Sequence, residues 1–162
     1  MHFITTIAAL LFSSSLYANN NCTEQKKLAV CTESSVQERV DWACTQLAEQ
    51  GKTAILKINS MRFECCGEPN YVWVNDYTPK MIVHPMRPVL NGVDLSDETD
   101  PKGVHLFKEF VAAAQKSPQG SWVQYQWTKF GEKNPTTKKS WIRACKAKDV
   151  EQTWVVGSGT WE

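Results

Sequence analysis

Hydrophobic positions recur with helical spacing in the first half of the chain. Four of them define one apolar stripe: Val36, Val40, Ala43 and Leu47. This spacing predicts an amphipathic helix that packs against the rest of the protein. Ser35 and Glu38 have the spacing of a capping box, so we expect the helix to begin with Ser35 as its N-cap. A second helical stretch is expected over residues 52–63.

From residue 71 onward the apolar positions alternate with polar ones, which is typical of β-strands. Strands are expected over residues 71–76, 81–84, 121–128, 138–146 and 153–161. A long connection over 86–103 and a helix over 104–115 separate the second strand from the third. Two helices, two strands, a helix and three strands predict an α+β fold with a five-stranded antiparallel sheet.

The N-terminus has the pattern of a secretory signal over residues 1–18. Its apolar run, residues 3–12, is too short to span a bilayer, and Ala18 is a small residue before three asparagines. Residues 19–33 then form an N-terminal segment that contains cysteine, and 34–162 form a single domain, helical over 34–66 and sheet over 70–162. We therefore expect a periplasmic or secreted protein with no integral membrane segment after signal removal.

Six cysteines follow the predicted signal: Cys22, Cys31, Cys44, Cys65, Cys66 and Cys145. An even number in an exported chain predicts disulfides. Six cysteines allow 15 pairings, and the sequence does not choose among them. Most lie early in the mature chain, so we expect the bonds to fasten the N-terminal region to itself and to the sheet. A structural metal site is not expected, because the C-x-x-C spacing of zinc ligands is absent.

Composition and charge remove two classes of partner. The 162 residues carry 18 basic and 17 acidic side chains, a net charge of +1. There is no basic excess to bind nucleic acid or an anionic membrane surface.

The chain has no H-E-x-x-H or G-x-S-x-G motif, which are patterns found in enzymes. We therefore expect neither an enzyme nor a bound cofactor.

Six motifs occur in one order along the second half of the chain. They are Y-V-W-V-N-D from Tyr71, M-I-V-H-P from Met81, D-P-K-G-x-x-L-F from Asp100, W-V-Q-Y-Q-W from Trp122, K-K-S-W-I from Lys138 and W-V-V-G-S-G-T from Trp154. Together they resemble the single Cache domain, in its second subtype, of bacterial extracytoplasmic sensors. The resemblance implies a PAS-like fold, with N-terminal helices on one face of the sheet and a ligand pocket on the other. It also implies small organic ligands, often short carboxylates.

The resemblance also implies which residues line or border the pocket: Tyr71, Trp73, His84, Tyr125 and Lys138. Their chemistry suits a small carboxylate, which needs convergent donors and an apolar wall. Lys138 supplies a positive charge, Trp127 extends the wall beside Trp73, and Arg87 caps an anion from the loop. Only one of Lys138 and Lys139 can face the pocket, and the resemblance favours Lys138. Core packing is the alternative role for the aromatic residues.

Two functions follow as hypotheses. The first is an extracytoplasmic protein that binds a short carboxylate for chemotaxis or another signalling pathway. We expect it to act without its own transmembrane signalling module, because none follows Glu162. A membrane receptor or kinase is then the expected protein partner. The second is an exported, disulfide-stabilised interaction protein that no longer binds a small ligand.

Overall fold

The computed structural model describes residues 32–65 and 68–161. Its helices are α2 (Glu33–Gln50), η1 (Gly51–Thr53), α3 (Ala54–Ser60), η2 (Pro88–Leu90) and α4 (Leu106–Lys116). Its strands are β1 (Phe63–Cys65), β2 (Glu68–Asn70), β3 (Trp73–Asp76), β4 (Met81–Val83), β5 (Ser121–Thr128), β6 (Pro135–Lys146) and β7 (Thr153–Trp161). Within this described part, no helix is long and apolar enough to cross a membrane. The predicted signal, residues 1–18, lies outside it.

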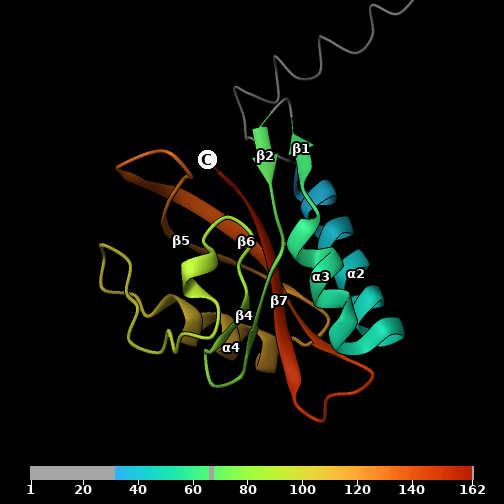
Figure 1. Cartoon of the computed structure of the whole chain (residues 1–162). Helices are drawn as coiled ribbons and strands as arrows, with labels where there is room; N and C mark the ends of the chain where they lie inside the picture. Colours follow the sequence, from blue (N-terminus) through green and yellow to red (C-terminus); the bar gives the residue numbers. More distant parts are fainter. Residues whose placement is uncertain (1–31, 66–67, 162) are drawn as a thin grey trace, which may run out of the picture.

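The expected α+β fold is confirmed. Strands β3 to β7 form one antiparallel sheet in the order β4-β3-β7-β6-β5. Helices α2 and α3 cover one face, and α4 lies on the other (Figure 1). The last strand in the sequence, β7, therefore occupies the centre of the sheet. Each face has its own hydrophobic cluster, and the α4 side contains the candidate site.

The apolar stripe of α2 packs as the sequence predicts. Its four residues are fully buried, against valines of β3 and β7 among others. The predicted N-cap is wrong by one turn, because Thr32 and not Ser35 caps the helix. The Thr32 hydroxyl oxygen accepts the Ser35 backbone N–H at 3.3 Å. Glu38 does not close a capping box and instead accepts the Ser34 hydroxyl. Thr32 offers the same capping oxygen, so the helix starts earlier.

The second helix is shorter than predicted, because α3 ends at Ser60 and Met61 is extended. Arg62 donates from Nη1 to the carbonyl oxygens of Asn59 and Met61, which satisfies acceptors at this helix end. Strands β1 and β2 then form a small antiparallel hairpin that the sequence analysis did not predict. Strands of three residues are too short to show alternation, and so residues 63–70 gave no strand signal.

The first sheet strand also begins later than predicted, at Trp73 and not at Tyr71. Side chains hold the segment before it against β7. Asn70 donates from Nδ2 to the Gly159 carbonyl at 2.7 Å, and the Ser158 hydroxyl donates to the Tyr71 carbonyl at 2.7 Å. Tyr71 is thereby fixed without a regular ladder.

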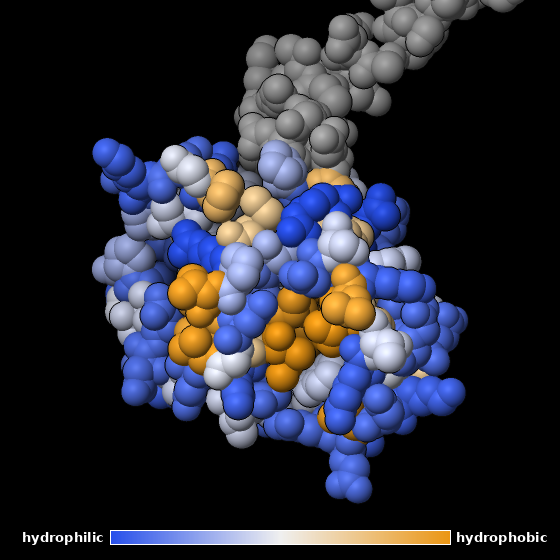
Figure 2. Space-filling model, in the orientation of Figure 1, coloured by the Kyte–Doolittle hydropathy of each residue, from blue (hydrophilic) through white to orange (hydrophobic). Residues whose placement is uncertain are grey.

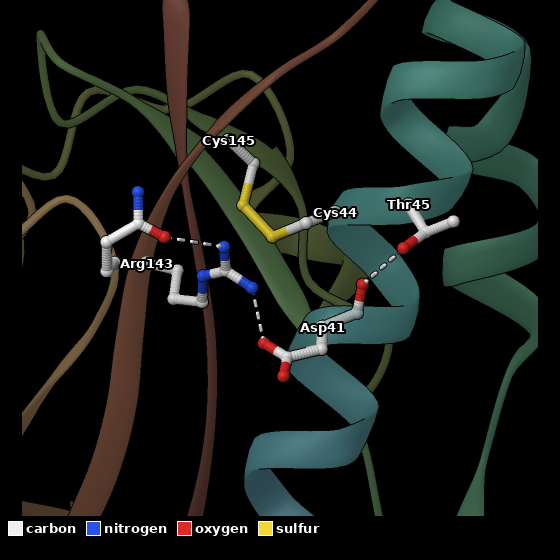
Figure 3. A network of polar contacts seen from close by, with 6 residues as sticks. Asp41, Cys44, Thr45, Arg143 and Cys145 are labelled. Carbon is white, nitrogen blue, oxygen red and sulfur yellow. Dashed lines mark hydrogen bonds and ion pairs between the residues drawn. A yellow bond between two sulfur atoms is a disulfide. The ribbon is translucent and has the colours of Figure 1, made fainter.

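One disulfide joins the helical layer to the sheet (Figure 3). It links Cys44 of α2 to Cys145 of β6 across a sequence separation of 101. Arg143 forms an ion pair with Asp41 beside it. This bond fits the expected fastening of the N-terminal region to the sheet. The other cysteines predicted to form disulfides are not described at the level of their side chains. Cys22, Cys31 and Cys66 lie outside the described residues, and for Cys65 the backbone alone is described.

Candidate ligand-binding site

A buried pocket lies between the sheet and α4. Its lining residues are Tyr71, Trp73, His84, Leu106, Phe107, Phe110, Tyr125 and Trp127. Five of the seven residues predicted from the sequence are among them. The cavity volume is about 10 Å³, which is room for about one water molecule. The walls are mostly aromatic, and their few polar groups are concentrated at Tyr71, His84 and Tyr125.

Lys138 lies directly behind two of these walls. Its side chain is 1% exposed, and Nζ is 3.4 Å from the Tyr71 hydroxyl oxygen. Nζ also lies 4.8 Å from the ring centroid of Tyr71 and 5.6 Å from that of Trp73. Lys139 points to the opposite face, where it pairs with Glu33 of α2. The structure thus places Lys138, and not Lys139, on the pocket side of β6.

Two glycines of β7 make room for these side chains. A Cβ atom at Gly157 would lie 2.4 Å from the indole of Trp73. A Cβ atom at Gly159 would lie 2.5 Å from Cε of Lys138 and 2.7 Å from the backbone oxygen of Lys139. Glycine within a strand often marks a close approach of this kind. Strand β7 therefore forms the floor under both Trp73 and Lys138.

His84 follows β4 and is fixed by the turn after it. Its backbone N–H donates to the Asn91 side-chain oxygen at 2.7 Å, so the residue leaves the ladder and β4 ends one residue earlier than predicted. Its Nδ1 accepts the Arg87 backbone N–H at 3.0 Å. In the neutral ring the proton must then be on Nε2, which makes His84 a hydrogen-bond donor. Burial, together with the charges of Lys138 and Arg87, lowers the pKa of His84 to about 3.

This pKa gives the first prediction, which concerns acid stability. The folded-state pKa of His84 is below the value of 6.5 for the unfolded chain. Between these values the unfolded chain binds more protons, so stability falls as the pH falls through this window. His84→Asn keeps an acceptor near Nδ1 but does not titrate. We expect the wild-type protein to lose roughly 2–3 kcal/mol more than this variant between pH 7 and pH 4.

Urea denaturation at several pH values measures this difference. His105→Asn is the matched control, because His105 is exposed. Equal pH dependence in the wild-type and His84→Asn proteins would contradict the prediction, because it would mean that the pKa of His84 is the same in the folded and unfolded states.

The two tyrosines remain phenols at neutral pH. Burial raises the pKa of Tyr71 to about 12, and it raises the pKa of Tyr125 well above its ordinary value. The Tyr125 hydroxyl shares a hydrogen bond of 2.9 Å with the Ser140 hydroxyl. Both residues can therefore donate a proton in a hydrogen bond to an anion.

Trp73 carries a buried donor that is not satisfied within the described part of the chain. Its indole Nε1–H is inaccessible to solvent and has no acceptor among the described residues. Buried polar groups in folded proteins are nearly always hydrogen-bonded to protein, water or ligand, so a small molecule in the pocket is one candidate acceptor. A carboxylate oxygen is an acceptor of this kind.

Arg87 lies beside the pocket and not in its wall. Its guanidinium stacks 4.5 Å from the ring centroid of Trp127, and Nη2 donates to the Thr128 carbonyl at 2.9 Å. It lines an open cleft of about 330 Å³ whose other walls include Asp100 and Gln126. Trp127 lines both this cleft and the buried pocket. The stacked pair of Arg87 and Trp127 therefore separates the pocket from the open cleft.

Among the described residues, no acidic side chain forms an ion pair with the cations of the site. None of the three ion pairs between described residues includes Lys138 or Arg87. Burial and the charge of Arg87 lower the pKa of Lys138 to about 7. An anion in the pocket would favour the charged form of this lysine and would gain from both cations. The geometry therefore suits a small anion with an apolar body.

Sequence reasoning did not assign four further residues to the site. Leu106, Phe107 and Phe110 of α4 line the pocket, but the sequence pattern predicted only a helix over 104–115. Trp161 was not considered, yet its ring centroid is 4.5 Å from Nζ of Lys138. The spacing of apolar residues in α4 predicts only that one face of this helix is buried. The approach of Trp161 depends on the pairing register of β6 and β7.

The comparison with known families decides what kind of domain this is. The sequence model of the family described as Single Cache domain 2 matches residues 18–161. The chain belongs to this Cache family. The resemblance recognised in the motifs is thereby confirmed.

Two curated proteins show the setting in which similar Cache domains occur. The chain is 37% identical over 108 residues to the methyl-accepting chemotaxis protein McpP of Pseudomonas putida, covering 67% of the chain and 18% of that protein. It is 32% identical over 95 residues to the sensor histidine kinase MctS of Rhizobium johnstonii, covering 59% of the chain and 19% of that kinase. The chain thus spans less than a fifth of either relative.

Solved Cache structures agree with the fold. The periplasmic sensor domain of a chemotaxis protein superposes with a TM-score of 0.66 at 29% identity, over 89% of this chain and 99% of the other. A Cache chemosensory domain described for its carboxylic acid recognition superposes with a TM-score of 0.63 at 27% identity, over 91% of this chain and 99% of the other. The chain is therefore a Cache sensor domain related to those of chemoreceptors and sensor kinases.

Proposed function

We propose that this Cache domain binds a short monocarboxylate outside the cytoplasmic membrane and that binding serves signalling and not catalysis. The observation that carries the proposal is the pair of cations, Lys138 and Arg87, which lie beside a buried aromatic pocket and form no ion pair among the described residues. The carboxylic acid recognition described for a structural relative supports the same ligand class. A membrane receptor or a kinase is the proposed destination of the signal, as in the relatives.

The groups around the pocket divide into those for a charged head and those for an apolar tail. Lys138, the Tyr71 hydroxyl and the Nε2–H of His84 offer charge and donors. Leu106, Phe107 and Phe110 offer an apolar surface on the α4 side. A carboxylate with a short alkyl chain satisfies both, whereas a long or strongly polar tail has no complementary wall.

The ligand must enlarge the pocket, because even acetate is larger than one water molecule. Trp127 is the wall that adjoins the open cleft, so its outward rotation is the proposed route of enlargement. Arg87 stacks on the same ring and is positioned to meet an approaching anion in the cleft. The proposed binding therefore couples ligand entry to movement of the Arg87–Trp127 pair.

A thermal-shift screen of the oxidised chain tests the proposal. The compounds are acetate, propionate, lactate, pyruvate, amino acids and small amines. A ligand that binds the folded state raises the melting temperature with its concentration. We expect a rise with one or more short carboxylates and none with the amines. No rise with any carboxylate, for a protein verified as folded, would contradict the proposal.

Trp73→Phe gives the second prediction, which tests the unsatisfied indole donor. Removal of a hydrogen bond from a buried ligand costs about 1–3 kcal/mol, so carboxylate affinity should fall roughly 5- to 150-fold. Stability should change little, because the loss of ring area and the loss of an unpaired donor oppose each other. Calorimetry gives the affinity and urea denaturation gives the stability. Trp122→Phe removes the same ring area outside the pocket and should leave affinity unchanged.

The alternative function is an exported interaction protein without a small ligand. Two observations favour it. The pocket is small, and apolar side chains gather on one face of the molecule (Figure 2). Leu56 and Val89 are 76% and 82% exposed. A flat carboxylate screen together with a stable protein complex that is lost in Leu56→Ser or Val89→Ser would support this alternative.

A further inference from the structure

Trp161 lies at the end of the central strand and directly opposite Lys138. The two residues are cross-strand partners in the β6–β7 ladder. The Trp161 ring centroid is 4.5 Å from Nζ of Lys138, which is nearer than the centroid of Tyr71 or Trp73. Trp161 is 7% exposed, so the contact is shielded from water. A desolvated ammonium over an indole face is the stronger form of this interaction.

The surroundings of Lys138 show why such a contact matters. The hydroxyl of Tyr71 is its nearest polar partner, at 3.4 Å. Titratable groups that lie near or act on this ammonium include the Tyr71 phenol, Arg87 and His84, none of which is a carboxylate. Lys129 is the other cation near Trp161, with Nζ 5.7 Å from the ring centroid. The aromatic rings are therefore what favours the ammonium form in this buried position.

Two features of β7 act on Lys138 together. Gly159 leaves space for its Cε, and Trp161, two residues further on and on the same face of the strand, covers its Nζ. We propose that Trp161 is a positioning residue: its indole face holds the Lys138 side chain as an ammonium ion beside the ligand pocket. This inference rests on the proposed carboxylate binding, because the ammonium is the charge that the ligand would meet.

A consequence is that ligand binding changes the environment of Trp161. A carboxylate in the pocket attracts the ammonium toward Tyr71 and away from the indole. The indole of Trp161 lies at the end of β7, outside the pocket. The environment of this strand end therefore differs between the free and the ligand-bound protein.

The first test measures the titration of Lys138 without any ligand. Lysine labelled with ¹³C at Cε is followed by NMR, and Lys138→Arg assigns the signal. We expect Trp161→Leu to lower the pKa of Lys138 by roughly 0.5–1.5 pH units, and Trp161→Phe to lower it less. Trp122→Leu is the matched control, because Trp122 lies 5.5 Å from the Lys139 ammonium. An unchanged Lys138 pKa in folded Trp161→Leu and Trp161→Phe proteins would overturn the inference.

The second test measures acetate affinity by calorimetry from pH 6 to pH 9. Affinity should fall as the pH rises through the pKa of Lys138, and in Trp161→Leu the fall should begin at lower pH. Equal weakening at every pH would indicate a purely structural role and overturn the inference. If neither acetate nor another screened carboxylate binds the wild-type protein at pH 6, the proposed function fails, and the NMR titration still decides the role of Trp161.

Discussion

Replacement of Lys138 by alanine is expected to weaken acetate binding at pH 6 by roughly 100-fold. The wild-type lysine is charged at this pH, because its pKa is about 7. Truncation of one member of a buried charge pair costs about 2–5 kcal/mol, largely because the other charge is left unpaired. Isothermal titration calorimetry measures the loss.

The neighbouring lysine supplies a matched control. Lys139→Ala removes the same side chain one residue away, on the opposite face of β6, and should leave acetate affinity unchanged. The aromatic rings that surround Nζ of Lys138 remain in Lys138→Ala, so added methylammonium should restore part of the affinity. Wild-type affinity in a folded Lys138→Ala protein would place the ligand elsewhere.

Removal of the Cys44–Cys145 disulfide is expected to lower the free energy of unfolding by about 3–5 kcal/mol. The bond closes a loop with a sequence separation of 101, and loops of this length gain most from cross-linking of the unfolded chain. The double variant Cys44→Ala/Cys145→Ala leaves any disulfide between the other cysteines intact, whereas a reducing agent would break such bonds as well. Urea denaturation of the oxidised proteins measures the difference.

The ion pair beside the disulfide provides the comparison. Asp41→Asn removes the charge that meets Arg143 at a partly exposed position. Such pairs contribute about 0–1 kcal/mol, so this variant should lie close to the wild-type protein. A disulfide effect no larger than that of Asp41→Asn would mean that the unfolded chain is already constrained by other cross-links.

Long periodic elements could be predicted from the sequence, and short or tertiary features could not. The strands over 121–128 and 153–161 match the structure at both ends, because each is rich in aromatic and β-branched residues and is bounded by turn residues. The capping of α2 was misplaced because Thr32 and Ser35 are both good N-caps. Local spacing cannot choose between two such candidates when packing makes the choice.

In the candidate site, too, some features could be predicted from the sequence and others could not. The resemblance to Cache domains identified Tyr71, Trp73 and Lys138, because each of them lies within one contiguous motif of the sequence. The tautomer of His84 could not be predicted, because it depends on a backbone N–H three residues later in a turn. Trp161 requires the strand register, which no single segment contains. Ligand binding by these residues stays a prediction.

The central place of β7 has a consequence for the order in which the protein can fold. Hairpins β3–β4 and β5–β6 can each form from neighbouring residues, but β7 must insert between them before one sheet exists. Until then β3 and β6 present open edges, which favour pairing with other chains. A chain that emerges from a ribosome or a translocation channel N-terminus first would keep both edges open until residue 161 is free. Folding of this sheet is therefore a late event, in which the open edges and the floor of the pocket are completed together.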